Sequence, residues 1–265
     1  MAFSALRNAI AHRLTHLGRR VATDPGWSAI CAGLGAPGML SGLMHLRERG
    51  FSPAVVVDCG ACVGDWSRLL LRIFPQAKVL MVEPQQRHAV ALRALCASHA
   101  SALHLATSLV GPPGMDAADF VVLDDSGAGT GSSVLAENSQ VPRHVVRLPV
   151  VTLDALVAQH GLAAPDLIKL DVQGFEIEVL KGASAALASA SFVLLEVSLV
   201  PYNQGSPLLA EVVAWMDGHG YRVHDVFDLT RRGDGVMLQA DLLFVRKGSR
   251  LDVQLAAFGE PGKQA

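Results

Sequence analysis

Residues 55–67, VVVDCGACVGDWS, decide the fold of this chain. A short apolar run ends at Asp58, and Gly60 and Gly64 follow it in the spacing D-x-G-x-x-x-G. An apolar run of this length that ends in glycines is typical of a buried strand. In the turn that follows, Gly60 permits close approach of a ligand, Gly64 lets a helix start against the strand, and Asp58 can accept hydrogen bonds or offset a cationic ligand. The segment therefore predicts a strand-to-helix turn that binds a ligand.

On both sides of this turn, apolar and amphipathic stretches alternate. We expect strands near 54–58, 78–83, 102–107, 167–171, 192–198, 221–226 and 241–246, and helices near 39–49, 64–73, 85–98, 152–160, 174–187 and 207–218. The less regular region between Gly111 and Pro149 is expected to hold an antiparallel insertion with strands near 119–123 and 144–150. The alternation predicts a Rossmann-like α/β fold, a mostly parallel sheet with helices on both faces. Ligands bind such sheets beyond the carboxyl ends of the strands.

The composition fits one large domain with short extensions. Of the 265 residues, 51% are hydrophobic and 17% are charged, which excludes a chain disordered by composition. A net charge of −2 gives no sign of a nucleic-acid partner, and four cysteines in a chain with this much core need no disulfide framework. We predict a helical N-terminal extension over 1–50, which starts with a basic amphipathic helix over 1–20, a main domain over 51–250 and a tail over 251–265. No stretch has the character of a transmembrane segment or a secretory signal, so we expect a cytoplasmic protein.

The second strand, KVLMVEP at 78–84, ends in Glu83, which lies 25 positions after Asp58. An acidic residue one strand–helix–strand unit after the first turn can bind both ribose hydroxyls of a nucleoside. The dinucleotide pattern G-x-G-x-x-G would need glycine where the chain has Cys62. These features favour S-adenosylmethionine, a nucleoside ligand without phosphate. Thr107 and Ser108, which end the third strand, are candidates for contact with the adenine edge.

The segment LIKLDVQGFEIEVLKGA at 167–183 carries charge into a buried strand. Lys169 lies within the apolar run and Asp171 at its tip. Burying charged side chains is costly unless they are paired or functional, so Asp171 is a candidate for contact with a reacting group. Cys59 and Cys62 have the spacing of half a metal site but lack companion ligands, so we predict no metal there.

In combination, these segments resemble the FkbM-type methyltransferase family. The matching pieces, in the family's order, are VVVDCGACVGDWS, LMVEP, TLDAL at 152–156, IKLDVQGFEIEVLKGA, FVLLEVS at 192–198 and ADLLFVRK at 240–247. The resemblance implies a class I fold with a seven-stranded sheet whose last strand is antiparallel. It also implies methyl transfer from S-adenosylmethionine, usually to a hydroxyl oxygen.

The predicted site has a cofactor half and a catalytic half. Asp171, Gln173 and Glu196 are the catalytic candidates, and Asp171 is also a candidate ligand for a divalent metal, as in some relatives. The family usually has Asn at position 62 and Glu at position 173, where this chain has Cys62 and Gln173. The amide of Gln173 cannot accept a proton or hold a metal as a carboxylate would. The cofactor half comprises Asp58, Gly60, Ala61, Cys62, Gly64, Glu83, Pro84, Thr107 and Ser108.

Several alternatives stay open at this point. Because of Gln173, one alternative is a non-catalytic subunit that binds S-adenosylmethionine. Another is a nucleotide-dependent oxidoreductase, which the general fold would also suit. The methyl acceptor could be a hydroxyl of a sugar, a glycan or a polyketide-type small molecule. Tyr202 and Asn203 either line the acceptor pocket or form a turn. Nothing in the sequence fixes the oligomeric state.

Overall fold

A computed structural model describes residues 37–123, 131–138 and 141–252. The basic helix predicted over 1–20 and most of the predicted tail lie outside the described residues. Within those ranges, no helix is long and apolar enough to cross a membrane.

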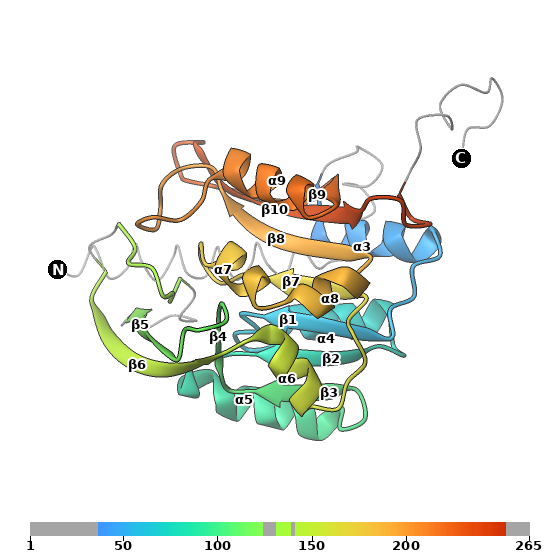
Figure 1. Cartoon of the computed structure of the whole chain (residues 1–265), viewed down its shortest axis with the longest axis horizontal. Coiled ribbons are helices and arrows are strands. Elements are labelled where there is room, and N and C mark those ends of the chain that lie inside the picture. The colour runs from blue at the N-terminus through green and yellow to red at the C-terminus, as the bar shows by residue number, and fades with distance from the viewer. Residues whose placement is uncertain (1–36, 124–130, 139–140, 253–265) are drawn as a thin grey trace.

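The centre of the molecule is a seven-stranded sheet (Figure 1). Its order is β3-β2-β1-β7-β8-β10-β9, and only β10 runs antiparallel to its neighbours, as predicted for the last strand. The chain order reverses between β1 and β7, which is where ligands bind in open α/β sheets. The strands are β1 Val55–Cys59, β2 Lys78–Val82, β3 Leu103–Ala106, β7 Leu167–Leu170, β8 Phe192–Ser198, β9 Tyr221–Arg231 and β10 Met237–Arg246.

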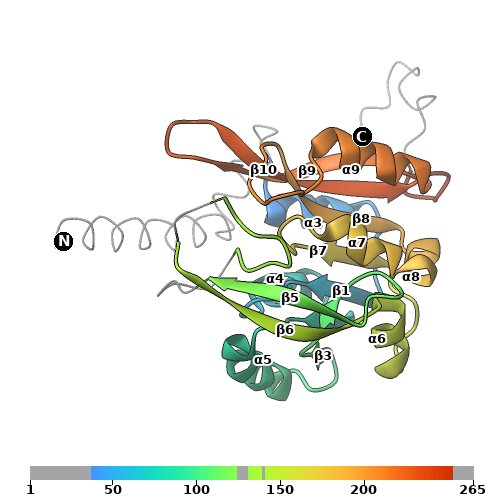
Figure 2. The same ribbon diagram turned by 60° about the vertical axis from the view of Figure 1, so that its left-hand side comes forward.

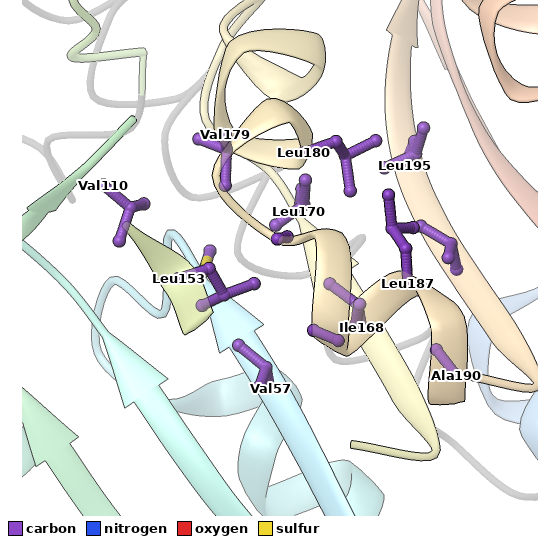
Figure 3. Packing of buried hydrophobic residues seen from close by; sticks show 14 of the residues in the cluster. Val57, Val110, Leu153, Ile168, Leu170, Val179, Leu180, Leu187, Ala190 and Leu195 are labelled. Atoms are coloured by element: carbon purple, nitrogen blue, oxygen red, sulfur yellow. The ribbon is translucent and has the colours of Figure 1, made fainter. Parts of the chain in front are cut away.

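Helices cover both faces of this sheet (Figures 1 and 2). One face packs against α3 Met39–Glu48, α4 Asp65–Ile73 and α5 Gln86–Ser98. The other packs against α6 Leu153–Gln159, α7 Glu176–Lys181, α8 Ser184–Ser189 and α9 Leu209–Gly218. Side chains alternate along each strand, so Val56 enters the first core and Val57 the second. In Figure 3, Val57 and Ile168 from the sheet lie beside Leu153 and Leu187 from the helices.

The helix predicted over 174–187 is wrong in its extent, because the chain forms α7 and α8 instead. The break falls at Gly182, where an added Cβ would lie 2.3 Å from the carbonyl oxygen of Gly111. The chain passes too close to this neighbouring loop for a larger residue. Strands β9 and β10 also extend beyond the predicted 221–226 and 241–246, to Arg231 and from Met237.

The expected antiparallel insertion is confirmed. Strand β5 Ala117–Leu123 pairs antiparallel with β6 Arg143–Val151, and β6 also pairs with the two-residue strand β4 Leu109–Val110. A strand as short as β4 carries no periodicity, which is why the sequence did not predict it. Phe120, on β5, lines the pocket described next, so the insertion helps to form it.

Candidate active site

A pocket of about 310 Å³ lies at the carboxyl ends of the central strands. Eight of the predicted site residues line it: Gly60, Cys62, Glu83, Pro84, Ser108, Asp171, Gln173 and Glu196. Four others do not line it: Asp58, Ala61, Gly64 and Thr107. The pocket thus brings the predicted cofactor residues and the predicted catalytic residues together.

The turn after β1 depends on two glycines. Gly60 has φ +78°, and an added Cβ there would lie 1.9 Å from the carbonyl oxygen of Asp171. Gly64 has φ +83°, and its added Cβ would meet the Leu95 side chain at 2.5 Å. Gly60 therefore lets the β1 and β7 ends approach each other, and Gly64 lets α4 begin against α5. Cys62, between them, adopts φ +50° without being glycine.

Glu83, directly after β2, is held by the main chain. Its carboxylate accepts hydrogen bonds from the N–H groups of Cys62 and Gln85, both at 2.9 Å. His88 Nδ1 lies 3.6 Å from Glu83 Oε1. The Cys62 side chain and the nearby Glu83 carboxylate raise the pKa of His88 to about 10. The carboxylate is only 3% exposed, and it is fixed at the pocket wall.

Asp58 is fully buried beneath the pocket. It accepts a hydrogen bond from Ser67 Oγ at 2.7 Å, and its Oδ1 lies 3.4 Å from Lys169 Nζ. Asp58 and Lys169 are register partners on β1 and β7. Lys169 Nζ is also 3.4 Å from Asp171 Oδ2, so it joins the two halves of the site from below. Burial alone would lower the pKa of Lys169, but the charges of Asp171 and Asp58 outweigh burial and raise it.

The opposite end of the pocket is a bridge of side chains. Gln173 Nε2 donates to Asp171 Oδ1 at 2.9 Å and to Glu196 Oε2 at 2.6 Å. Gln239 Nε2, from β10, also donates to Glu196 Oε2, at 2.8 Å. Gln173 therefore holds two carboxylates beside each other without adding a third. Glutamate, which the family usually has at position 173, would have no proton to donate to these carboxylates when ionised.

A buried carboxylate, Glu176, stabilises the turn that carries Gln173. Glu176 Oε1 accepts hydrogen bonds from the N–H groups of Val172 and Gly174, at 3.0 and 3.1 Å. Gln173 has φ +57°, and its carbonyl oxygen accepts a 2.6 Å hydrogen bond from Asn203 Nδ2. Burial raises the pKa of Glu176 to about 7 despite these bonds. The spacing D-x-x-G-x-E was the available sequence signal for Glu176.

Several carboxyl groups gather at the end of the pocket that holds the Asp171–Gln173–Glu196 bridge. Burial and the charges of Asp171 and Asp241 raise the pKa of Glu196 well above its ordinary value. Burial and the charge of Asp171 raise the pKa of Asp241 to about 7. Glu196 and Asp241 are register partners on β8 and β10, so their like charges oppose each other across the pair. In the described part of the chain, no group of three or more His, Cys, Asp or Glu side chains is arranged to hold a metal.

Sequence reasoning missed several lining residues. Of the pair left open, Tyr202 lines the pocket, and Asn203 lies outside the lining and donates to the Gln173 carbonyl oxygen. Other lining residues that were not predicted are Gln85, His88, Phe120, Ser132, Thr230 and Gln239. They come from the insertion, α5 and the β9–β10 hairpin, where no local motif marks them.

Comparisons with known proteins place the chain in a family. A sequence model described as "Methyltransferase FkbM domain" matches residues 58–223, more than half of the chain. Over 50 residues the chain is 40% identical to a hexuronic acid methyltransferase, AglP, of Haloferax volcanii. That match covers 19% of this chain and only 21% of that relative.

Solved methyltransferases are similar at lower identity. A methyltransferase FkbM from Methylobacillus flagellatus KT is 19% identical, with a TM-score of 0.48 over 77% of this chain and 47% of that one. Magnesium protoporphyrin IX methyltransferase from Synechocystis PCC 6803, solved with bound S-adenosylmethionine, is 12% identical, with a TM-score of 0.45 over 78% of each chain. On the strength of the match over residues 58–223, this chain belongs to the FkbM methyltransferase domain family.

Proposed function

We propose that the chain is an S-adenosylmethionine-dependent O-methyltransferase that acts on a hydroxyl of a sugar, glycan or polyketide-type small molecule. The observation that carries the proposal is one pocket with two differently built ends. A main-chain-fixed carboxylate, Glu83, lies at one end, and the Asp171–Gln173–Glu196 bridge lies at the other. The first suits a ribose and the second suits an acceptor hydroxyl.

The residues at the β1 and β2 ends fit this cofactor. The oxygens of Glu83 are held toward the pocket wall and have lone pairs left for two ribose hydroxyls. Gly60 has no side chain, so its backbone is accessible to a ligand where the β1 and β7 ends approach each other. Ser108 lines the pocket together with apolar Val110 and Phe120, which suits an adenine ring. The volume of about 310 Å³ is within the range of small-molecule sites. We place Asp58 as a support for Lys169 and Asp171, because it is fully buried.

The carboxylates of Asp171 and Glu196 orient the acceptor hydroxyl and receive its proton. S-adenosylmethionine, when bound, supplies a methyl group already activated by its sulfonium. When the acceptor oxygen takes up that methyl group, its hydroxyl proton would pass to one of these carboxylates. A base works best when its pKa lies near the working pH, and the raised pKa of Glu196 moves it in that direction. Alignment of the two reactants in the pocket supplies the rest of the rate gain.

Among the possible acceptors, a sugar hydroxyl is favoured by the similarity to one curated relative. The relative from Haloferax volcanii is named for a hexuronic acid, although the match covers only about a fifth of its length. The acidic pocket gives no support for a nucleic-acid partner, whose phosphates require cationic side chains.

Titration calorimetry tests the cofactor half of the proposal. We expect S-adenosylhomocysteine to bind and NAD not to bind. Because hydrogen bonds to charged groups contribute about 1.5–3 kcal/mol, Glu83→Ala should weaken binding at least about tenfold. Glu178→Ala, which removes an exposed carboxylate paired with Lys181, is the matched control and should bind normally. NAD binding in place of adenosylhomocysteine would favour the oxidoreductase alternative, and cofactor binding without transfer to any acceptor would favour the non-catalytic subunit.

A further inference from the structure

We propose that the acceptor is a neutral or amino-bearing polyol with no negative charge next to its reacting hydroxyl, and that the site rejects uronates and phosphorylated sugars. This inference rests on the proposed function and narrows its substrate class. It comes from the balance of charges and of hydrogen-bond donors at the acceptor end.

The acceptor end has more acidic groups than basic groups. Asp171 and Glu196 line it, and Asp241 and Asp58 lie behind them. Lys169 is the cation beside this cluster, and it is bound from behind by Asp58 and Asp171 at 3.4 Å each. One buried cation therefore faces several carboxylates.

No lysine or arginine lines the pocket among the residues that the structure describes. The basic side chain in the lining is His88, which lies against Glu83 at the cofactor end. Arg143, close enough to influence Tyr202, donates to the main-chain oxygen of Glu137 at 2.6 Å. An anionic group beside the Asp171–Gln173–Glu196 bridge would therefore meet carboxylates, with no lysine or arginine of the described pocket lining to offset them.

The hydrogen-bonding groups point to the same acceptor chemistry. Ionised carboxylates only accept hydrogen bonds, and the Gln173 and Gln239 amides already donate to them. Gln173 donates both amide protons to these carboxylates, so the bridge itself offers carboxylate and amide oxygens, which call for donors on the ligand. The donors left nearby, the second N–H of Gln239 and the Thr230 hydroxyl, are neutral and do not offset a negative charge. Hydroxyls of a polyol and an ammonium group supply donors, whereas a carboxylate or a phosphate supplies acceptors.

The titration behaviour of the cluster agrees with this geometry. Burial, and after it the neighbouring carboxylates, Asp171 first, raise the pKa of Glu196 well above its ordinary value and that of Asp241 to about 7. An anionic acceptor would have to bind in its protonated form or against the repulsion of these carboxylates. Burial limits screening by salt, so this repulsion would persist at high ionic strength.

The experiment uses four matched acceptors: methyl glycosides of a hexose, a 2-amino hexose, the corresponding hexuronic acid and a hexose 6-phosphate. Each is incubated with the full-length protein and S-adenosylmethionine labelled in its methyl group. We expect transfer to the hexoside or the amino hexoside at least about tenfold faster than to the uronide or the phosphate, because like charges placed together cost several kcal/mol. Glu196→Gln should reduce this ratio even where it lowers every rate, and Glu178→Gln should leave it unchanged.

Faster transfer to the uronide or the phosphate would overturn the inference, as would an unchanged ratio in Glu196→Gln. Failure to label any of the four would also overturn it, because the site would then not accept a sugar polyol. Calorimetry with S-adenosylhomocysteine on the same samples separates the two proposals. If the cofactor binds, only the acceptor class is wrong; if it does not bind, the proposed function itself fails.

Discussion

The two ends of the pocket are built in different ways. At the cofactor end, main-chain N–H groups of Cys62 and Gln85 fix Glu83. At the acceptor end, side-chain amides of Gln173 and Gln239 fix Asp171 and Glu196. A site held by the backbone tolerates changes of neighbouring side chains, whereas a site held by side chains changes its chemistry with each of them. The cofactor end should therefore be the constant part of the molecule, and the acceptor end the part that sets the reaction.

The largest effect expected from this difference is a loss of turnover without a loss of cofactor. Asp171→Asn keeps the shape of the side chain but removes its charge and basicity. We expect turnover to fall roughly 10²–10⁴-fold, the range for a lost general base, while the affinity for S-adenosylhomocysteine changes little. Steady-state kinetics and calorimetry measure the two quantities.

Asp119→Asn, at an exposed carboxylate paired with Arg147, is the matched control and should not change either. A chelator added to the wild type tests a metal role of Asp171, and we expect no change in rate. An equal loss of cofactor affinity in Asp171→Asn would contradict the division into two ends, because Asp171 would then support both through Lys169.

A smaller effect should follow from adding a charge to the bridge. Gln173→Glu places a third carboxylate within hydrogen-bond distance of Asp171 and Glu196. Because like charges disfavour the ionised form, the pKa of Glu196, already raised, should rise further. The acid limb of the pH profile of kcat/KM should then move upward by about one unit, with activity recovering at high pH.

Gln204→Glu adds the same charge at an exposed position outside the pocket lining and should leave the profile in place. Lys169, Glu176, Asp241 and Tyr202 also face the bridge, and Glu176 and Asp241, whose pKa values are raised to about 7, titrate in the same range. The shift is therefore measured against the Gln204→Glu profile. An unchanged profile would show that the charge at position 173 does not act on the reacting base, and a downward shift would contradict the repulsion between the carboxylates.

The same contrast explains what the sequence could predict. The strand–turn–helix after β1 and the spacing to Glu83 are local, so most of the cofactor end followed from short motifs, and the seven-stranded sheet followed from the family resemblance that those motifs carry. Asp171, Gln173 and Glu196 were named as candidates, but their bridge was not. It depends on β8 and β10 pairing so that Gln239, 43 positions after Glu196, reaches the same carboxylate. Register between distant strands has no local signal.

Burial was the second source of differences. Asp58 matched the motif position of a ligand contact, yet its side chain points into a buried pair with Lys169 and Ser67. His88 lies on α5, and no motif in the sequence marks it as a site residue. Its contact with Glu83 appears only when the helix is placed against the strand end.

The smallest effect we predict concerns the cofactor end, where the backbone rather than the side chain matters. Cys62 adopts φ +50°, in the left-handed region that asparagine tolerates better than cysteine. Its N–H donates to Glu83, and any residue at this position keeps that bond. Cys62→Asn should therefore raise the free energy of unfolding by about 0.5–1 kcal/mol without weakening cofactor binding. Chemical denaturation of the unliganded protein measures it, with Cys62→Ala as the matched control, because it also removes the thiol but does not make the left-handed conformation easier to adopt. A loss of stability in Cys62→Asn would mean that the hydrogen bond between the thiol and His88 outweighs the backbone strain, and that this end, too, is held by its side chains.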